Sequence, residues 1–370
     1  MRWNWQLPQW PHFTYDPKLI AHQEKQFLVT VGSAFAFLKN IGDQDYHQFV
    51  VEILSDEGLE SSKIEGEILD RESLQSSIKK QFGLKASPRK KEANKEIGMA
   101  DLLHDVYKSF DTPLTHKILW QWHSKLFEGH TTMESGKYRT HQEPMQIVSH
   151  RFDSPRVFFE APPSDDVHKE MTKFINWFNA TRDSEPILGR AAIAHVYFES
   201  IHPFEDGNGR IGRVLVEKIL SQGVERPILI AVSKVLENRR KEYYSGLEKC
   251  NRTLKVDRWV EFFADVILQA QSESINLLYY LIEKAKMLKN LSGEINVRQE
   301  KVLLRMFREG LRGFKGGLSA EKYITITKTS RATATRDLSE LVQKGALLKT
   351  GELKHTRYWL NLPSVKKENK

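Results

Sequence analysis

The sequence predicts a mainly α-helical protein: a helical core with one β-hairpin, a helical extension before the core, and a winged helix-turn-helix module after it. Through most of the first 290 residues, apolar residues recur at three- and four-residue spacings, which indicates amphipathic helices. This period is lost between residues 136 and 163, where β-prone runs stand instead. A chain of 370 residues exceeds one ordinary core. We therefore expect the extension at 1–90, the core at 91–290 and the module at 291–370.

The composition narrows the class of protein. Cys250 is the only cysteine, which excludes an intramolecular disulfide and a cysteine-based zinc site, and we interpret it as structural. No run of about 18 apolar residues occurs, so no membrane-spanning helix is predicted. The N-terminus lacks the continuous apolar core of a signal peptide. We expect a cytoplasmic protein that does not bind a membrane.

The individual elements follow from the pattern of residue types along the chain. Aromatic and proline residues dominate positions 1–17, which predicts an extended segment packed by its rings rather than a helix. The runs MQIVS and RVFFE within 136–163 predict the two strands of the hairpin. Helical spacing predicts helices at about 18–38, from 46 onward, and at 90–110, 113–127, 164–181, 187–201, 210–220, 233–249 and 258–289.

The stretch HPFEDGNGR, residues 202–210, lies between two apolar helical segments and combines groups that a fold alone seldom requires. Gly207 and Gly209 permit positive φ and a close approach of the backbone. They precede a helix whose first N–H groups are unpaired and whose dipole is positive at this end, so the turn suits an anion. Arg210 and Arg213 add two bidentate donors, which suits a polyphosphate better than one carboxylate.

Two further side chains of this stretch suit group transfer from a nucleotide. Asp206 would repel a phosphate unless a divalent cation lay between them, and Mg²⁺ held by one carboxylate and phosphate oxygens fits. His202, at the end of the preceding helix, is placed to accept a proton near neutral pH. The stretch therefore predicts a site with an anion-binding turn, two arginines, a metal carboxylate and a base.

The same stretch resembles the signature of Fic proteins, H-x-F-x-[D/E]-G-N-G-R-x-x-R. The matching residues are His202, Phe204, Asp206, Gly207, Asn208, Gly209, Arg210 and Arg213. The resemblance implies a Fic-type helical core in which this loop binds ATP and Mg²⁺ and transfers AMP to a hydroxyl side chain of a target protein.

The resemblance also implies a role for each residue of the loop. His202 would be the general base, Asp206 would hold Mg²⁺, and Asn208 with the loop amides would hold the α-phosphate. Arg210 and Arg213 would bind the outer phosphates. The hairpin at 136–163 corresponds to the flap of the family, on which an extended piece of the target protein docks by β-strand addition.

A second motif lies upstream of the core. The stretch SSKIEG matches [S/T]-x-x-x-E-[G/N] of self-inhibited Fic proteins through Ser61, Glu65 and Gly66. The resemblance implies that this inhibitory helix, around 61–66, places Glu65 against Arg213 and so denies the γ-phosphate its partner. ATP would then bind only in an unproductive pose.

The basic residues concentrate in the last segment of the chain. Residues 295–370 contain 17 Lys+Arg and 7 Asp+Glu, a net charge of +10, which leaves −2 for the remainder of a chain whose total is +8. The predicted order there is a helix at 298–307, a helical stretch near 319–322, a helix at 329–344 and two strands around Gly351. This order is typical of a winged helix.

A winged helix has more than one use. DNA contact through 319–357 is one expectation, because Arg331, Thr333 and Arg336 lie at the start of the predicted recognition helix. Winged helices also serve as protein-binding or dimer modules, so a homodimer stays open.

The sequence therefore supports one main hypothesis and two alternatives. The main hypothesis is a self-inhibited, Mg²⁺-dependent protein adenylyltransferase that modifies Ser, Thr or Tyr hydroxyls. The first alternative is the removal of AMP at the same site, in which Glu65 would orient a water molecule. The second is a DNA-binding regulator whose Fic-like site only senses a nucleotide. No residue that reads adenine can be identified from the sequence, and nothing in it identifies the target.

Overall fold

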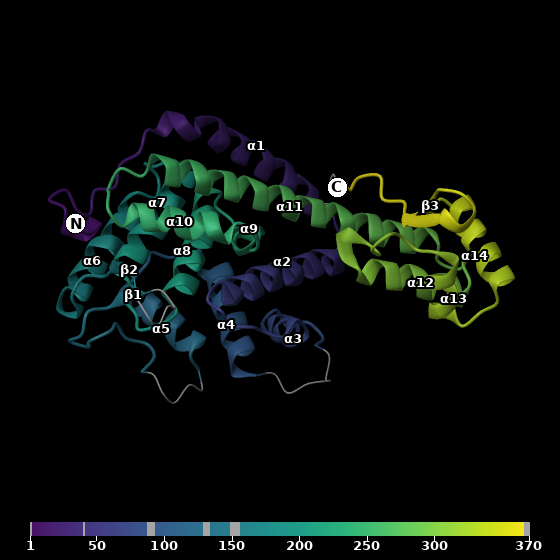
Figure 1. The fold of residues 1–370 in the computed structure, drawn as a ribbon, viewed down its shortest axis with the longest axis horizontal. Helices are drawn as coiled ribbons and strands as arrows, with labels where there is room; N and C mark the ends of the chain where they lie inside the picture. The colour runs from purple at the N-terminus through teal and green to yellow at the C-terminus, as the bar shows by residue number, and fades with distance from the viewer. Residues whose placement is uncertain (1, 40, 87–92, 129–133, 149–155, 366–370) are drawn as a thin grey trace. The chain divides into compact units, whose positions relative to one another are not determined.

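The computed structural model (Figure 1) describes residues 2–39, 41–86, 93–128, 134–148 and 156–365. The protein is mainly α-helical, as predicted. It forms two compact units, one made of Met1–Asn40 and Val50–Ser274 and the other of Ile41–Phe49 and Ile275–Lys370. Within the described ranges, no helix is both long enough and apolar enough to cross a membrane. The domain boundaries near residues 90 and 290 stay predictions.

The first unit consists of α-helices and one hairpin. Two short 3-10 helices, η1 (Asn4–Gln6) and η2 (Pro17–Ile20), come first in the chain. The helices that lie wholly in this unit are α1 (Ala21–Leu38), α3 (Arg71–Gln81), α4 (Asn94–Ser109), α5 (His116–Leu126), α6 (Ser164–Ala180), α7 (Ile187–Ile201), α8 (Asn208–Gly223), α9 (Val232–Asn238) and α10 (Arg240–Cys250). Two long helices, α2 (Asp43–Ile64) and α11 (Asp257–Asn290), contribute residues to both units.

Helices α7 and α8 pack against each other in the interior of the first unit (Figure 1). α7 is apolar on nearly every side, and such a helix belongs in a protein interior. Leu188, Phe198 and Ile201 of α7 are fully buried, as is Ile211 of α8. The six residues between the two helices are therefore a loop held at both ends by buried structure.

The N-terminal segment packs by its aromatic rings, as predicted. The Trp10 ring meets the Tyr197 ring of α7 edge-on, with centroids 5.2 Å apart. The buried Asn4 donates a hydrogen bond of 2.7 Å from Nδ2 to the Ser200 hydroxyl of α7. The 3-10 helix η1 departs from the predicted extended segment, because a turn of three residues leaves no periodic apolar signal.

The predicted hairpin is present. Strand β1 (Gln146–Val148) pairs antiparallel with β2 (Val157–Glu160) in the register Gln146↔Glu160. The loop 149–155 lies outside the described residues. The buried Arg139, just before the hairpin, donates from Nε to the His202 carbonyl at 2.8 Å, and its backbone N–H donates to the Pro203 carbonyl at 2.9 Å. Arg139 thus fixes the base of the hairpin to the loop between α7 and α8.

The predicted helix at 233–249 is in fact two helices, α9 and α10. The break falls at Arg239, whose φ of −108° and ψ of 28° leave the helical region. Apolar spacing continues across the break through Val235, Leu236 and Tyr243, all buried. Because periodicity records burial rather than backbone continuity, it could not reveal a break of one residue.

The second unit contains three short helices and a second hairpin. Its elements after α11 are α12 (Val297–Arg308), η3 (Gly310–Arg312), α13 (Ala320–Thr327), α14 (Arg331–Gln343), β3 (Leu347–Thr350), η4 (Leu353–His355) and β4 (Arg357–Leu360). The buried Asp337 of α14 accepts from Arg298 Nε of α12 and from the Tyr323 hydroxyl of α13, both at 2.9 Å. This network ties the three helices together. Leu318 and Tyr358 exchange two backbone hydrogen bonds beside the hairpin.

Candidate functional site

His202 follows the last residue of α7 and faces a cavity of the first unit. It adopts the left-handed conformation, with φ of 51° and ψ of 61°, and its side chain is 14% exposed. Burial, together with the charge of Arg139, lowers the pKa of His202 to about 4. The ring is therefore neutral at pH 7 and able to accept a proton.

The loop after His202 is shaped by its glycines and by Asn208. Gly207 has a φ of +81°, and a Cβ there would lie 2.8 Å from the Phe127 ring. The Asn208 side chain accepts from the Phe204 N–H at 2.9 Å and donates to the Phe204 carbonyl at 2.7 Å. Asn208 thus holds the loop closed through its side chain. Its assignment to the α-phosphate stays a prediction.

Arg213 lies against the upstream motif, in the geometry that the sequence predicts. Its NH2 group lies 2.8 Å from Glu65 Oε1 and donates to the Ser61 carbonyl at 2.8 Å, while Nε donates to Ser61 Oγ at 2.9 Å. Burial disfavours the charge of Arg213, but the Glu65 carboxylate outweighs burial and raises the pKa of the guanidinium. A Cβ on Gly209 would lie 2.1 Å from Glu65 Oε1, so a glycine is required there for Glu65 to approach.

Arg210 is also held by the upstream segment. Its side chain is 6% exposed, and NH1 lies 2.7 Å from Glu67 Oε2. The guanidinium lies over the Phe127 ring, 4.9 Å from its centroid. Gly66, with a φ of +84°, makes the turn between Glu65 and Glu67. Sequence reasoning missed Glu67, although a second acid two residues after the motif was a visible signal.

The end of α2 is fastened to α10. The Ile64 carbonyl accepts from Arg240 NH2 at 2.7 Å and from the Tyr244 hydroxyl at 3.1 Å. These two bonds satisfy a carbonyl that a helix end leaves without an intrahelical partner. Lys63 of α2 adds an ion pair of 3.5 Å to Glu237 of α9.

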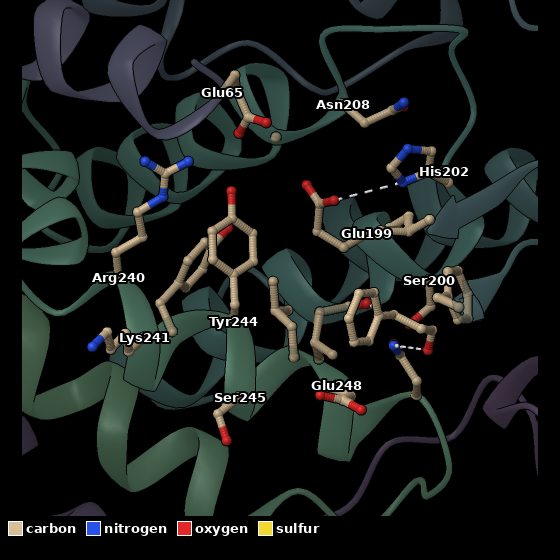
Figure 2. Close-up of a pocket in the computed structure, with 18 of the residues that line it drawn as sticks. Glu65, Glu199, Ser200, His202, Asn208, Arg240, Lys241, Tyr244, Ser245 and Glu248 are labelled. Carbon is tan, nitrogen blue, oxygen red and sulfur yellow. Dashed lines mark hydrogen bonds and ion pairs between the residues drawn. The ribbon is translucent and has the colours of Figure 1, made fainter. Parts of the chain in front are cut away.

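The cavity has a volume of about 1230 Å³ and lies between the loop, the hairpin and α10. Figure 2 shows Glu199 and His202 on one side of it, with Tyr244 and Arg240 on the other, near Glu65. Tyr243, Tyr244 and Leu247 of α10 give this far wall an aromatic and aliphatic surface. Sequence reasoning missed this wall. The adjacent aromatic residues in the polar stretch RKEYYSGL were its only signal.

Asp206 is the residue predicted to hold Mg²⁺. Its side chain is 61% exposed, and Oδ1 accepts from the Gly207 N–H and lies 3.4 Å from Arg210 NH2. Among the described residues, no group of three or more His, Cys, Asp or Glu side chains could hold a metal ion. A single accessible carboxylate beside the N-terminus of α8 is the kind of ligand that Mg²⁺ accepts when waters and phosphate oxygens complete its shell.

Comparisons with known proteins match two segments of the chain to family models. The family model described as the Fic/DOC family matches residues 113–220, and one described as a domain of unknown function, DUF4172, matches residues 3–84. A protein adenylyltransferase of Caenorhabditis briggsae is 30% identical over 169 residues, which cover 44% of this chain and 30% of the relative. A probable protein adenylyltransferase of Aquifex aeolicus is 34% identical over 110 residues, which cover 27% of this chain and 32% of the relative. The chain spans about a third of the length of these curated relatives.

Solved structures share the fold over more of the chain. A Fic family protein from Desulfovibrio desulfuricans G20 aligns over 95% of this chain and 98% of its own, with a TM-score of 0.53 and 21% identity. A Fic-1 structure from C. elegans aligns over 70% of this chain and 73% of its own, with a TM-score of 0.51 and 21% identity. Residues 113–220 therefore form a Fic/DOC domain.

Proposed function

We propose that the protein is an adenylyltransferase, which moves AMP from ATP to a Ser, Thr or Tyr hydroxyl of a target protein and is inhibited by its own Glu65. One observation carries the proposal. A neutral, buried His202 shares one cavity with the start of α8, whose two arginines are buried and now neutralised by acids of the same chain. The names of the curated relatives agree with this chemistry.

A nucleotide would fit the cavity in one orientation. The first N–H groups of α8 and the two arginines would hold the phosphates. The base would then lie against Tyr243, Tyr244 and Leu247 of α10, which supply the apolar and aromatic contacts that a purine ring favours. Asp206 would hold Mg²⁺, which supplies positive charge to the phosphates when it is bound.

The residues of the chain account for the transfer step. The target hydroxyl oxygen bonds to the α-phosphorus, the bond from that phosphorus to the oxygen bridging to the β-phosphate breaks, and pyrophosphate leaves. His202 takes the hydroxyl proton, because its ring is neutral and faces the cavity. Ile147 and Val148 of β1 are exposed and line the same cavity. An extended piece of the target would dock beside them by adding a strand.

Inhibition follows from the contacts of Glu65. Its carboxylate occupies Arg213, so the outermost phosphate of ATP has to displace an ion pair in which the arginine is nearly fully buried. Withdrawal of Glu65 would free the arginine for ATP.

The experiment uses α-³²P-labelled ATP and Mg²⁺ with lysate proteins as acceptors. We expect little label with the wild type, more with Glu65→Gly, and none when His202→Ala is added to Glu65→Gly. If none of the three proteins transfers label while ATP still binds, the proposal is wrong. AMP removal or nucleotide sensing would then explain the site. Incubation with a protein that already carries AMP separates these two.

A second function is favoured by a specific observation in the other unit. The side chains of Arg331 and Arg336 on α14 are 77% and 68% exposed, while the network at Asp337 fixes the helix that bears them. Their ion pairs, at 3.5 Å to Glu321 and 4.0 Å to Glu340, are exposed and contribute little, so phosphates could replace the acids. We infer that the three helices and the hairpin form a winged helix that binds DNA through α14.

A further inference from the structure

We propose that Glu199 is a positioning residue for His202: its side-chain carboxylate receives the Nδ1 proton, which leaves Nε2 free to take the proton of the target hydroxyl. This inference rests on the proposed function. It assigns a role to a residue of α7 that lies outside both sequence motifs.

The geometry places the two side chains face to face. Glu199 and His202 are three residues apart at the end of α7, and Oε2 lies 3.7 Å from Nδ1. Their side chains are 13% and 14% exposed, so little water competes for either. Figure 2 shows the carboxylate pointing toward the imidazole, with this contact drawn as a dashed line.

Apart from the backbone carbonyl of Glu199, the described residues give neither side chain another hydrogen-bond partner. Among the described residues, His202 Nδ1 and Glu199 Oε1 are buried atoms without a hydrogen bond of normal geometry. A buried polar atom without a hydrogen bond destabilises the fold, so a helix whose other residues are mostly apolar does not gain stability from a glutamate here. The neighbouring buried residues Val196, Phe198 and Ile201 are apolar, as packing alone would require.

The Glu199 carboxylate packs closely against Gly212 of α8. A Cβ on Gly212 of α8 would lie 2.7 Å from Oε1, so the carboxylate fills space that only a glycine provides. Burial, together with the charge of Glu65 and against that of Arg213, raises the pKa of Glu199 to about 8. Withdrawal of Glu65 removes one of these causes and favours the ionised carboxylate in the active state.

The chemistry explains why the contact matters during transfer. When Nε2 takes the hydroxyl proton, the ring becomes an imidazolium with N–H groups on both nitrogens. A carboxylate facing Nδ1 in a buried site stabilises this charge, because little solvent screens the attraction. A small movement would shorten 3.7 Å to a hydrogen bond. The backbone carbonyl of Glu199 also contacts the ring, and every side-chain variant keeps it.

The kinetic test is made in the Glu65→Gly protein, so that transfer is measurable. We expect Glu199→Gln, which keeps the size and loses the charge, to lower kcat by about 10- to 100-fold. KM for ATP should change by less than about twofold, because a contact made in the transition state affects kcat. Glu199→Asp should retain more activity than Glu199→Gln. The matched control is Glu217→Gln on α8, a buried acid with no contact to His202, which should leave kcat unchanged.

A second measurement does not depend on transfer. Ring ¹⁵N shifts, assigned to His202 with a His202→Ala spectrum, report which nitrogen bears the proton. We expect the proton on Nδ1 in the Glu65→Gly protein and a shift toward Nε2 after Glu199→Ala. An unchanged tautomer, or equal kcat in the Glu199→Gln and Glu217→Gln proteins, would overturn the role of Glu199. Absence of transfer in Glu65→Gly alone would count against the proposed function, and the tautomer would still decide this inference.

Discussion

Glu67 and Arg210 form an ion pair of 2.7 Å, next to the pair that Glu65 forms with Arg213. One upstream segment thus neutralises both arginines at the start of α8. The arginines lie three residues apart on α8, and the acids lie two apart on either side of the Gly66 turn. If these acids inhibit the enzyme as we propose, activation has to break two ion pairs rather than one.

We expect Glu67→Gln to raise AMP transfer of the otherwise wild-type protein by about two- to fivefold, because a partly exposed ion pair contributes about 0.5–1 kcal/mol. Initial rates with labelled ATP measure the effect. Glu60→Gln is the matched control: it lies on α2 with similar exposure and pairs with Lys63 instead of an arginine of the turn. Equal rates for the Glu67→Gln protein and this control would show that the second pair does not restrain the enzyme.

The hydrogen bonds from α10 to the Ile64 carbonyl lead to a separate prediction about the end of α2. Tyr244→Phe keeps the aromatic wall of the cavity and removes the hydroxyl that donates at 3.1 Å. Loss of one such bond, about 1 kcal/mol, should weaken the hold on α2 and raise transfer about fivefold. KM for ATP should be unchanged. Tyr244→Ala should instead weaken ATP binding, because it removes the ring. If the phenylalanine variant binds ATP as poorly as the alanine variant, the ring is not the part that the nucleotide contacts.

The sequence predicted what local pattern and motif spacing determine. It placed the helices around 202–210, the hairpin, and the approach of Ser61 and Glu65 to Arg213, which the motif implied. It did not reveal Glu67, Arg139 or the α10 wall. Each of these depends on a partner far along the chain: Arg210 lies 143 residues from Glu67, and Tyr244 lies 180 residues from Ile64. Such pairs are set by how helices pack, which no local period records.

Buried neutral histidines should make stability depend on pH. Burial, with a further effect of Arg213, lowers the pKa of His195 to about 3, and its Nε2 lies 2.8 Å from the Tyr243 hydroxyl. Because the unfolded chain binds the proton near pH 6.5 and the folded protein does not, stability is lost as pH falls below about 6.5. We expect His195 to account for about 2 kcal/mol of the loss between pH 7 and pH 5.

Urea unfolding of wild type and His195→Gln at both pH values isolates this contribution. The fall in unfolding free energy from pH 7 to pH 5 should be smaller in the variant, whatever its stability at pH 7. Buried carboxyl groups such as Glu199 and Glu217, whose pKa values burial raises, act in the opposite sense but are common to both proteins. The same fall in both proteins would mean that His195 is protonated in the folded state.

The second unit should bind duplex DNA through α14 in a salt-dependent way. We expect Arg331→Ala with Arg336→Ala to reduce the slope of log K against log salt concentration by about 2, because each phosphate contact contributes about 0.9. Fluorescence anisotropy of the full chain with a labelled random duplex gives both affinity and slope. Lys301→Ala on α12 is the control, since it removes an exposed charge from the unit without changing α14. An unchanged slope in the double variant, or no binding by the wild type at low salt, would reject α14 as a DNA-binding helix. A change in oligomeric state with the same variant would instead indicate that this face joins two copies of the chain.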